Sequence, residues 1–406
     1  AAGLPPARVT PARRTFGRTA PAPATGPAGR TPPATDVARR IAEVWAATLD
    51  VPAADIAEED NFFDLGGNSL AAMRVVAALR PLITLRQLMT HSDLGPLARA
   101  AEAAQPAETP GATPGTGSGA AVASGTGSGA EAGAGAARAG DDSLLQPLSP
   151  PGVAADRVLV CFPYAAGNPL AFRPLAEALA GHGVAVQAVA LPGHDPGRPE
   201  PLVDLDEVAR RVADEVRAAD RGEVLIWGHC VGAALAVEVT RLLAAAGAPP
   251  ARLFLGGKLL RDAADIDASI AEVRALDEAG VVDWLVGQTG FTDLDGLDAE
   301  HTSALVAAFR HDALGSHAYL RDQLAPLADR PLTVPVTVVL ADDDPLTAGS
   351  ADEHAAWRRI AADVTLEEID GGGHYFCRTR AGEVAALVGA AGPAAPRARR
   401  PGEDHV

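Results

Sequence analysis

The spacing of apolar residues divides the chain into two unlike blocks. From Thr35 onward, apolar side chains recur at steps of three and four residues, at Val37, Ile41, Val44, Trp45 and Leu49. This spacing is typical of an amphipathic helix, for which Thr35 or Asp36 is available as the N-cap residue. Helical periodicity continues to about Ala101. We therefore expect a small all-α domain at residues 35–101, large enough to fold alone.

The second block, residues 144–395, carries a different pattern. Apolar runs rich in β-branched residues alternate with helical periodicity such as that of residues 205–219 and 233–243. The runs cover residues 157–162, 184–191, 224–227, 252–255, 334–340 and 364–369. This alternation predicts a mostly parallel sheet with helices on both faces. Residues 260–330 have helical periodicity alone, so we expect a helical lid at about 262–330 over the carboxyl edge of the sheet.

The remaining segments have little to bury. Residues 1–34 hold five arginines, no acidic residue and repeated Pro, Ala and Gly. We interpret them as a disordered linker cut from a longer polypeptide rather than a targeting signal. Residues 102–143 are predicted to be a flexible Gly/Ala/Pro linker, and residues 396–406 a disordered tail. Such a linker spans about 35 Å on average, so it lets the small domain visit the large one repeatedly.

Composition narrows the classes of function. The chain of 406 residues has 34 Lys+Arg against 52 Asp+Glu, a net charge of −18. This charge argues against binding to nucleic acid or to an anionic membrane. Three cysteines make a disulfide framework unlikely to form, which favours a reducing, cytoplasmic location. The sequence suggests no membrane span, no metal cluster and no dinucleotide loop.

A candidate nucleophile lies between an apolar run and an Ala/Leu-rich helix, in Trp227-Gly228-His229-Cys230-Val231-Gly232. This is the context of the G-x-S-x-G nucleophile elbow, with Cys in place of Ser. Gly228 and Gly232 would let strand and helix approach closely. Cys230 would then protrude at a helix N-terminus, where the dipole favours a thiolate. The alternative is a buried, inert cysteine between two spacer glycines.

The partners of a nucleophile should follow in the order acid, then histidine. His374 lies just past the last apolar run on a glycine-rich loop and is the predicted general base. For the acid, Asp344 is the first choice, Asp342 the second and Asp262 the third. His229 is a rival base, but its side chain should pack beneath the elbow. His311 and His317 are assigned to the lid.

Two backbone N–H groups are needed to hold an oxyanion. Val231, directly after the nucleophile, should supply one, and Ala165, in the loop after the first run, the other. Cys161 and Cys377 are expected to be core thiols. Candidate pocket-lining residues on the lid are Asp283, Trp284, Phe309, Arg310 and Tyr319.

The small domain carries one conspicuous serine. The segment Asp60-Asn-Phe-Phe-Asp-Leu-Gly-Gly-Asn-Ser-Leu70 precedes a helical pattern, so Ser69 is predicted at a helix N-cap with its hydroxyl outward. A helix N-terminus suits a phosphate group. His91, in a short polar turn, is poorly placed as a base, so we expect Ser69 to be modified rather than catalytic. The alternative is a plain capping serine.

This segment resembles the D-x-F-F-x-L-G-G-x-S-L motif of peptidyl carrier domains of nonribosomal peptide synthetases, and the resemblance covers about Thr35 to Ala101. It implies a four-helix carrier with 4′-phosphopantetheine covalently attached to Ser69 by a phosphopantetheinyl transferase. Arg80-Pro81-Leu82 stands where such carriers have a longer loop, a departure that bears on how the carrier docks.

Residues 144–390 resemble the thioesterase domains of the same assembly lines, which have the α/β-hydrolase fold. The matching segments are residues 161–167, 191–194, 228–232, 342–346 and 372–374. The placement of Asp-x-Asp-Pro-Leu is similar to that of stand-alone, editing-type members. Cysteine at position 230 departs from the usual serine; a minority of members carry it, and some of those release strained or cyclic products.

Together the resemblances imply the last station of a peptide assembly line, with upstream synthetase domains as partners. A peptidyl thioester on the Ser69 arm would pass to Cys230. Cyclisation to a lactone or lactam, including strained rings, or hydrolysis would then release the peptide. Two alternatives remain: an editing hydrolase that removes stalled acyl groups, and a non-catalytic docking platform.

Overall fold

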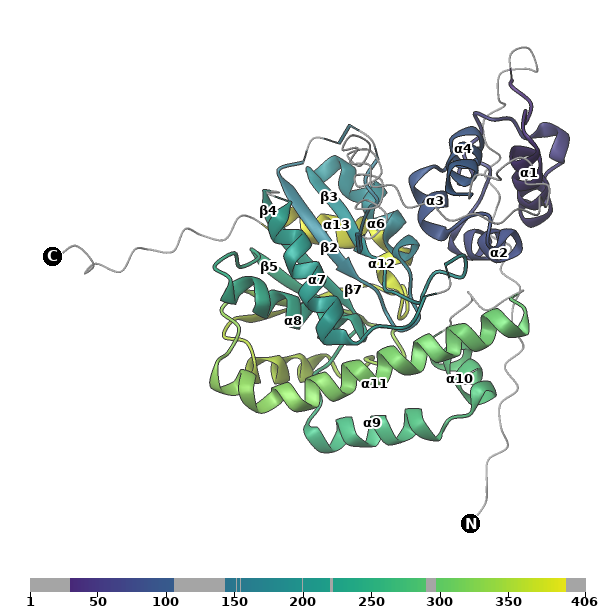
Figure 1. The fold of residues 1–406 in the computed structure, drawn as a ribbon. Helices are drawn as coiled ribbons and strands as arrows, with labels where there is room; N and C mark the ends of the chain where they lie inside the picture. The colour runs from purple at the N-terminus through teal and green to yellow at the C-terminus, as the bar shows by residue number, and fades with distance from the viewer. Residues whose placement is uncertain are drawn as a thin grey trace, which may run out of the picture.

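The computed structural model describes residues 30–105, 143–150, 152–153, 155–198, 200–219, 222–289 and 297–391. The predicted tail at 396–406, and most of the predicted linkers at 1–34 and 102–143, lie outside these residues. The described residues form a small helical domain that packs beside a larger sheet-containing domain (Figure 1).

The small domain contains four α-helices and a short 3-10 turn. They are α1 (Asp36–Leu49), η1 (Ala53–Asp55), α2 (Ser69–Leu79), α3 (Leu85–Thr90) and α4 (Leu94–Ala104). Thr35 caps α1, its side chain accepting a hydrogen bond from the Ala38 N–H at 3.1 Å. At the centre, the rings of Trp45 and Phe62 are fully buried, with centroids 5.1 Å apart. Gly67 packs on Phe62 so tightly that a Cβ would lie 2.4 Å from its ring, which explains a glycine there.

One boundary of the small domain differs from the prediction. Residues 30–34 were expected to belong to the linker, but they bind the acidic segment 58–60. Arg30 forms an ion pair with Asp60, and the Ala34 N–H donates to Glu58 at 2.9 Å. Pattern analysis missed this contact because it depends on charge pairing across more than twenty residues rather than on apolar periodicity.

The larger domain is built on a seven-stranded sheet in the order β1-β3-β2-β4-β5-β6-β7. The strands are β1 (Leu145–Pro147), β2 (Arg157–Phe162), β3 (Val184–Val189), β4 (Glu223–His229), β5 (Arg252–Gly256), β6 (Val336–Ala341) and β7 (Val364–Ile369). All neighbouring pairs are parallel except β1 with β3. Strand β1 was not predicted, since three residues ending in proline form no apolar run.

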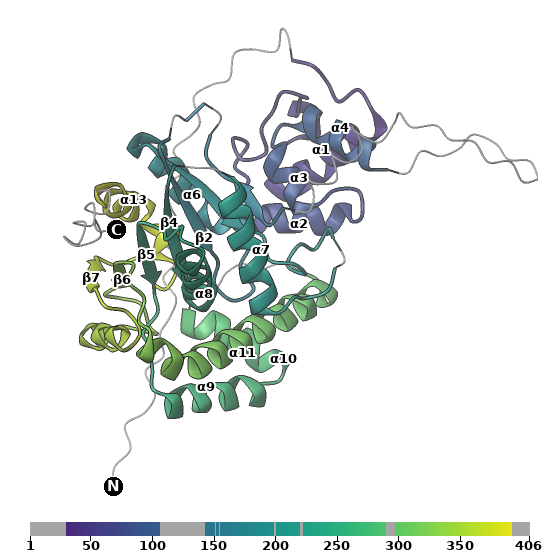
Figure 2. The ribbon, with the colours of Figure 1, turned by 60° about the vertical axis from the view of Figure 1, so that its left-hand side comes forward.

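Helices cover both faces of this sheet, as predicted (Figure 2). Helices α7 (Leu205–Ala218) and α8 (Gly232–Ala245) cover one face; the other is covered by α6 (Arg173–Leu179), α12 (Phe376–Thr379) and α13 (Ala381–Ala390). Neighbouring residues of β4 alternate accordingly, with Ile226 in the core on the α8 side and Trp227 in the core on the α6 side. This is the α/β-hydrolase architecture.

The strand order reverses between β2 and β4, which pair in parallel with Phe162 opposite Gly228. At such a reversal, the loops that leave the two strands diverge and open a crevice at their carboxyl ends. The crevice therefore opens beside residues 163–167 and Cys230.

Other connections of this domain contain 3-10 helices, namely η2 (Pro169–Phe172), η3 (Ala180–His182) and η5 (Ala351–Arg359).

Between β5 and β6 the regular secondary structure of the described residues is helical, apart from a single bridge at Leu332. This insert contains α9 (Ala263–Ala275), α10 (Glu278–Trp284), a π-helical turn η4 (Leu285–Thr289) and the long α11 (Ala299–Asp329). The helices lie across one end of the sheet (Figure 1), and their side chains share a cavity with residues that follow β4 and β7. The insert thus lies where the sequence predicted a lid.

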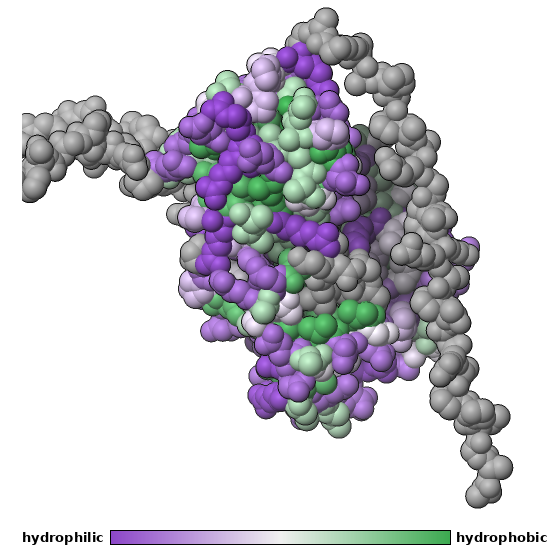
Figure 3. Space-filling view, turned by 90° about the vertical axis from the view of Figure 1, so that its right-hand side faces the viewer, coloured by the Kyte–Doolittle hydropathy of each residue, from purple (hydrophilic) through white to green (hydrophobic). Residues whose placement is uncertain are grey.

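None of the described helices has both the length and the apolar character needed to cross a membrane. On the face seen in Figure 3, hydrophilic residues surround smaller hydrophobic patches.

The packing around Phe62 predicts a local loss of stability. Phe62→Ala should destabilise the small domain by about 3–5 kcal/mol, the usual cost of emptying an aromatic core position. Hydrogen exchange in the whole chain should therefore accelerate in residues 36–104, with the strands β2–β6 unchanged. Val286→Ala, at a side chain that is 51% exposed, is the control and should alter neither region. Unchanged exchange in residues 36–104 would contradict a core centred on Phe62.

Candidate active site

Cys230 lies on a tight turn between β4 and α8. Its φ is +53°, in the left-handed region that non-glycine residues seldom adopt and that costs about 1–3 kcal/mol. The turn is held by the Cys230 N–H, which donates to the Gly256 carbonyl at 2.8 Å. A Cβ at Gly228 would lie 2.6 Å from the Ala236 side chain, and one at Gly232 2.4 Å from the Pro163 carbonyl oxygen. Both glycines are therefore required by close packing around the cysteine.

His374 and Asp344 meet at the ends of β7 and β6. Gly371, Gly372 and Gly373 all have positive φ, which turns the chain after β7 back over the sheet. His374 Nδ1 donates to the two carboxylate oxygens of Asp344, at 3.0 and 3.1 Å. Both residues are at least 98% buried. The carboxylate also accepts from the Leu346 N–H and the Thr347 hydroxyl, each at 3.0 Å, so its orientation is fixed.

The other candidate acids lie elsewhere. Asp342 accepts the Gly371 N–H at 2.8 Å, and its neighbour Asp343 accepts the Gly373 N–H at 2.7 Å. Asp262 caps α9, accepting the Asp265 N–H at 2.9 Å. These carboxylates shape turns, and Asp344 is the one of the three candidates that contacts His374.

Charge links the thiol to the imidazole. Burial alone would raise the pKa of the Cys230 thiol, but His374, Lys258 and the Val231 N–H together outweigh it and lower the pKa. Burial likewise disfavours the imidazolium, yet the thiolate and the Asp344 carboxylate raise the pKa of His374 to about 10. Nε2 of His374 is buried and makes no hydrogen bond of regular geometry with a described residue, as is frequent in unliganded sites. The arrangement favours a thiolate–imidazolium pair.

His229 is beneath the elbow, as expected. It is fully buried, and its Nε2–H donates to the His374 carbonyl at 2.6 Å. Burial and the neighbouring His374 lower its pKa to about 3, so the ring is neutral. It supports the backbone of His374. His311 and His317 lie on α11, and Cys161 and Cys377 are fully buried in the core.

The two N–H groups expected to hold an oxyanion belong to residues that border the same cavity. Val231 begins the turn into α8, and its N–H interacts with the Cys230 sulfur. Ala165 lies in the loop that leaves β2, across the crevice at the strand reversal. Both residues are more than 90% buried.

The cavity at Cys230 has a volume of about 220 Å³. Its walls come from the strand ends and from the insert, including Trp284 and Phe309 as expected. The remaining predicted lining residues serve packing: Arg310 binds the Leu276 carbonyl at 2.6 Å, and Tyr319 donates to Glu238 at 2.7 Å. Asp283 is not among the residues that border the cavity.

Sequence reasoning missed Lys258, which also lines this cavity. Burial lowers the pKa of its ammonium group, and the Cys230 thiolate partly offsets this. Its charge in turn helps to lower the thiol pKa. The signal was available in the strand order: β4 and β5 are neighbours, with His229 opposite Gly256, so the residues after each strand meet.

In the small domain, Asn68 rather than Ser69 is the N-cap of α2. The Asn68 side chain accepts the Ala71 N–H at 2.9 Å, and Ser69 is the first helical residue. The prediction was wrong by one position because both Asn and Ser are good capping residues. The attachment of a phosphate group is still compatible with this place, since the N–H groups of the first helical turn favour negative charge.

Comparison with known proteins agrees with both halves of the chain. The thioesterase domain family matches residues 157–391, and the phosphopantetheine attachment site family matches residues 39–101. A probable cadicidin biosynthesis thioesterase of Streptomyces griseus is 30% identical over 224 residues, which cover 55% of this chain and 59% of that protein. Nonribosomal peptide synthetase 13 of Aspergillus fumigatus is 39% identical over 74 residues, 18% of this chain and 3% of the synthetase.

Solved structures similar to the chain include the type II thioesterase YbtT of the yersiniabactin pathway, at 26% identity and a TM-score of 0.45. It covers 61% of this chain and 96% of its own. RedJ, a thioesterase from the prodiginine pathway of Streptomyces coelicolor, is 29% identical with a TM-score of 0.47, covering 60% of this chain and 88% of its own. The family match spans more than half of the chain, which therefore belongs to the thioesterase family and carries, ahead of that domain, a phosphopantetheine-bearing carrier domain.

Proposed function

We propose that the chain releases acyl groups from its own carrier at the end of a nonribosomal peptide synthetase, with Cys230 as nucleophile. The observation that carries this proposal is that Cys230 and His374 border one cavity and that Asp344 binds His374, on a chain that also holds a carrier domain. The order cysteine, aspartate, histidine along the chain is that of α/β-hydrolase triads.

Ser69, at the start of α2, is the proposed attachment residue. When bound, phosphopantetheine supplies a terminal thiol that carries an acyl group as a thioester. Cys230 attacks the carbonyl carbon of this thioester, and the N–H groups of Val231 and Ala165 stabilise the oxyanion. His374 gives its proton to the departing sulfur as the carbon–sulfur bond breaks. The acyl group is then attached to Cys230.

Release needs a second nucleophile. Water, or an amine or hydroxyl of the acyl chain itself, attacks the acyl-Cys230 carbonyl while His374 accepts its proton. Asp344 keeps Nδ1 of His374 protonated, so that Nε2 faces the reacting groups. The Cys230 thiolate leaves and regenerates the starting pair.

A cysteine nucleophile favours cyclisation more than a serine would, because transfer of the acyl group to Cys230 exchanges one thioester for another. The acyl group on Cys230 retains the reactivity that an oxoester would lose. We therefore propose that the product is cyclic, either a lactone or a lactam, and that strained rings are among the possible products. Hydrolysis is the competing outcome.

An editing role is the second candidate. A cavity of about 220 Å³ is smaller than the usual small-molecule site and suits a short acyl group better than a full peptide. Similarity to type II thioesterases is in line with this. Single-turnover release of acetyl and of peptidyl groups from the holo chain separates the roles: editing requires faster release of acetyl.

Intact-protein mass spectrometry tests the nucleophile. The holo chain, loaded with a peptidyl thioester, should transfer its acyl mass from Ser69 to Cys230, as peptide mapping after rapid quenching reveals. Cys230→Ala should leave the acyl mass on Ser69. Cys230→Ser should form an oxoester and shift the product from ring towards free acid. Release of the same product at the parental rate by Cys230→Ser would contradict the energetic argument.

The charge pair predicts the pH dependence of thiol alkylation. Iodoacetamide should label Cys230 well below the usual thiol pKa, because His374 lowers the pKa of this thiol. In His374→Ala, only burial and weaker partners remain, so the midpoint of labelling should rise by more than about one pH unit. Lys258→Met should raise it less. His354→Ala, at an η5 residue that does not border the cavity, is the control. An unchanged midpoint in His374→Ala would contradict the pairing.

A further inference from the structure

A buried ion pair joins the loop after β3 to α11, and the proposed mechanism does not use it. His194 ends the Leu-Pro-Gly-His segment of residues 191–194, and its side chain is 5% exposed. Its Nε2 lies 2.9 Å from the carboxylate of Asp312 on α11, and its Nδ1 lies 3.0 Å from the Pro192 carbonyl. Both ring nitrogens face oxygens that only accept, so the ring is held as an imidazolium.

The pKa values agree with this geometry. Burial opposes the charge of His194, but Asp312, with the Pro192 carbonyl and Glu200, outweighs it and raises the pKa of the ring. Burial would raise the pKa of Asp312 as well, yet His194 and further hydrogen bonds lower it to about 2. The Asp312 side chain is 10% exposed, so breaking the pair would leave a buried charge without its partner.

Asp312 also binds the loop that leaves β2. Its Oδ2 accepts the Ala166 N–H at 2.9 Å. Ala166 has a φ of +55°, a strained conformation that requires support from its surroundings. This hydrogen bond fixes the peptide unit between Ala165 and Ala166, and so constrains the residue whose N–H is proposed to hold the oxyanion.

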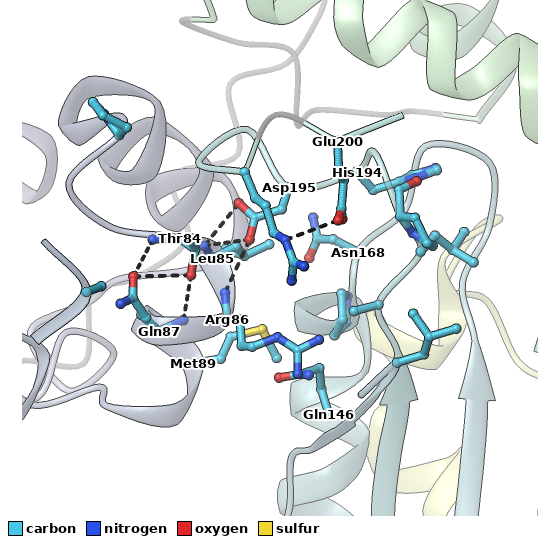
Figure 4. Close-up of a pocket in the computed structure, with 18 of the residues that line it drawn as sticks. Thr84, Leu85, Arg86, Gln87, Met89, Gln146, Asn168, His194, Asp195 and Glu200 are labelled. Carbon is cyan, nitrogen blue, oxygen red and sulfur yellow. Dashed lines mark hydrogen bonds and ion pairs between the residues drawn. The ribbon is translucent and has the colours of Figure 1, made fainter. Parts of the chain in front are cut away.

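Asp195, which follows His194 in the loop after β3, binds the carrier. Its carboxylate accepts the Leu85 N–H at 2.9 and 3.0 Å and the Arg86 N–H at 3.4 Å, at the start of α3 (Figure 4). The same carboxylate accepts the Gly197 N–H at 2.8 Å, which keeps it aimed at the carrier. N–H groups of a first helical turn have no partner within their own helix, so an external carboxylate is well matched to them.

Other contacts surround this one but leave space. Gly197 packs against α2 and the segment before α3, where a Cβ would lie 2.4 Å from the Ile83 carbonyl. Arg80 pairs with Glu300 of α11 at 3.0 Å. Between the two domains lies a cavity of about 460 Å³, lined from the carrier side by Met89 and from the sheet side by Gln146 (Figure 4). Incomplete packing suits a contact that must open and close.

We propose that Asp312 is a positioning residue that couples carrier docking to the geometry of the oxyanion site. Docking of α3 on Asp195 fixes the loop of residues 191–198. The His194–Asp312 pair passes that restraint to Ala166 and hence to Ala165. The inference rests on the proposed function for its catalytic consequence, while the linkage itself is a property of the fold.

Hydrogen exchange of the whole chain tests the linkage without turnover. Asp312→Ala should accelerate exchange of residues 163–167 and, more weakly, of residues 84–90 in the carrier. Asp195→Ala should also accelerate exchange in both segments, but with the larger effect in residues 84–90 and the smaller one in residues 163–167. Asp322→Ala, on the same helix with a side chain that is 62% exposed, is the matched control. Exchange that changes only next to each substitution overturns the coupling.

Should Asp312→Ala fail to fold, as judged by exchange in β4 and β6, His194→Gln cuts the same chain of contacts from the other side. The expected result is unchanged: faster exchange in both 163–167 and 84–90. Asp312→Asn keeps an acceptor for the Ala166 N–H and should disturb residues 163–167 less than Asp312→Ala.

Kinetics with two substrates test the positioning role. For a soluble acyl-N-acetylcysteamine thioester, which bypasses the carrier, Asp312→Ala should lower kcat about tenfold with little change in KM, since a misaimed oxyanion donor weakens transition-state binding. Asp195→Ala leaves the His194–Asp312 pair in place, so it should lower kcat for this substrate less than Asp312→Ala does. It should also slow single-turnover release from the Ser69 arm about fivefold, the effect of losing about 1 kcal/mol of docking energy.

These readouts distinguish the two ideas. Equal kcat for Asp312→Ala and the parent, per titrated Cys230 thiol, overturns the positioning role. Failure of the parent to cleave any thioester, with exchange responding as expected, contradicts the proposed function and leaves the linkage standing.

Discussion

The proposed chemistry depends on a negative sulfur and a positive imidazole being held together where little water reaches them. Neither charge is favoured by burial, and each lowers the free energy of the other. The sheet makes this pairing possible, because β4, β6 and β7 run in parallel and bring their carboxyl ends to one edge. The strained turn at Cys230 and the three glycines before His374 then set the final approach of the two side chains.

The same edge of the sheet also receives the carrier. The loops after β2 and β3 lie between the small domain and the cavity at Cys230, and α11 contacts both loops through Asp312. A single helix of the insert therefore touches the carrier through Glu300, the buried ion pair through Asp312 and the cavity through Phe309. An insert placed in this way can relate the arrival of a carrier to the shape of the site.

Much of the fold followed from the sequence, because apolar periodicity reports burial directly. The strands 157–162 and 364–369 have the predicted bounds, and the elbow glycines occupy positions with no room for a side chain. Local chemistry was less decisive. Three aspartates after β6 look alike in sequence, and only tertiary hydrogen bonds separate Asp344, which binds His374, from its neighbours, which cap a turn. Asn68 and Ser69 are likewise both good capping residues, and only the hydrogen bond from the Ala71 N–H identifies Asn68 as the N-cap.

The roles of residues that act through partners distant along the chain could not be predicted from the sequence. Lys258 is an isolated lysine until β4 and β5 are paired, and Asp312 is one acidic residue among many on a long helix until the fold brings His194 and Ala166 to it. Strand β1 escaped notice because it is short and lies at the sheet edge beside β3.

A thiolate that borders an open cavity, as Cys230 does, is also the species that peroxides oxidise most readily, first to a sulfenic acid. The other two cysteines of the chain, Cys161 and Cys377, are buried in the core, and burial raises the pKa of each thiol. Neither borders the cavity at Cys230, so neither is placed to convert an oxidised Cys230 into a protective disulfide. Recovery of the reduced form would then rest on small external thiols that can enter the cavity, a dependence that a serine at this position would not impose.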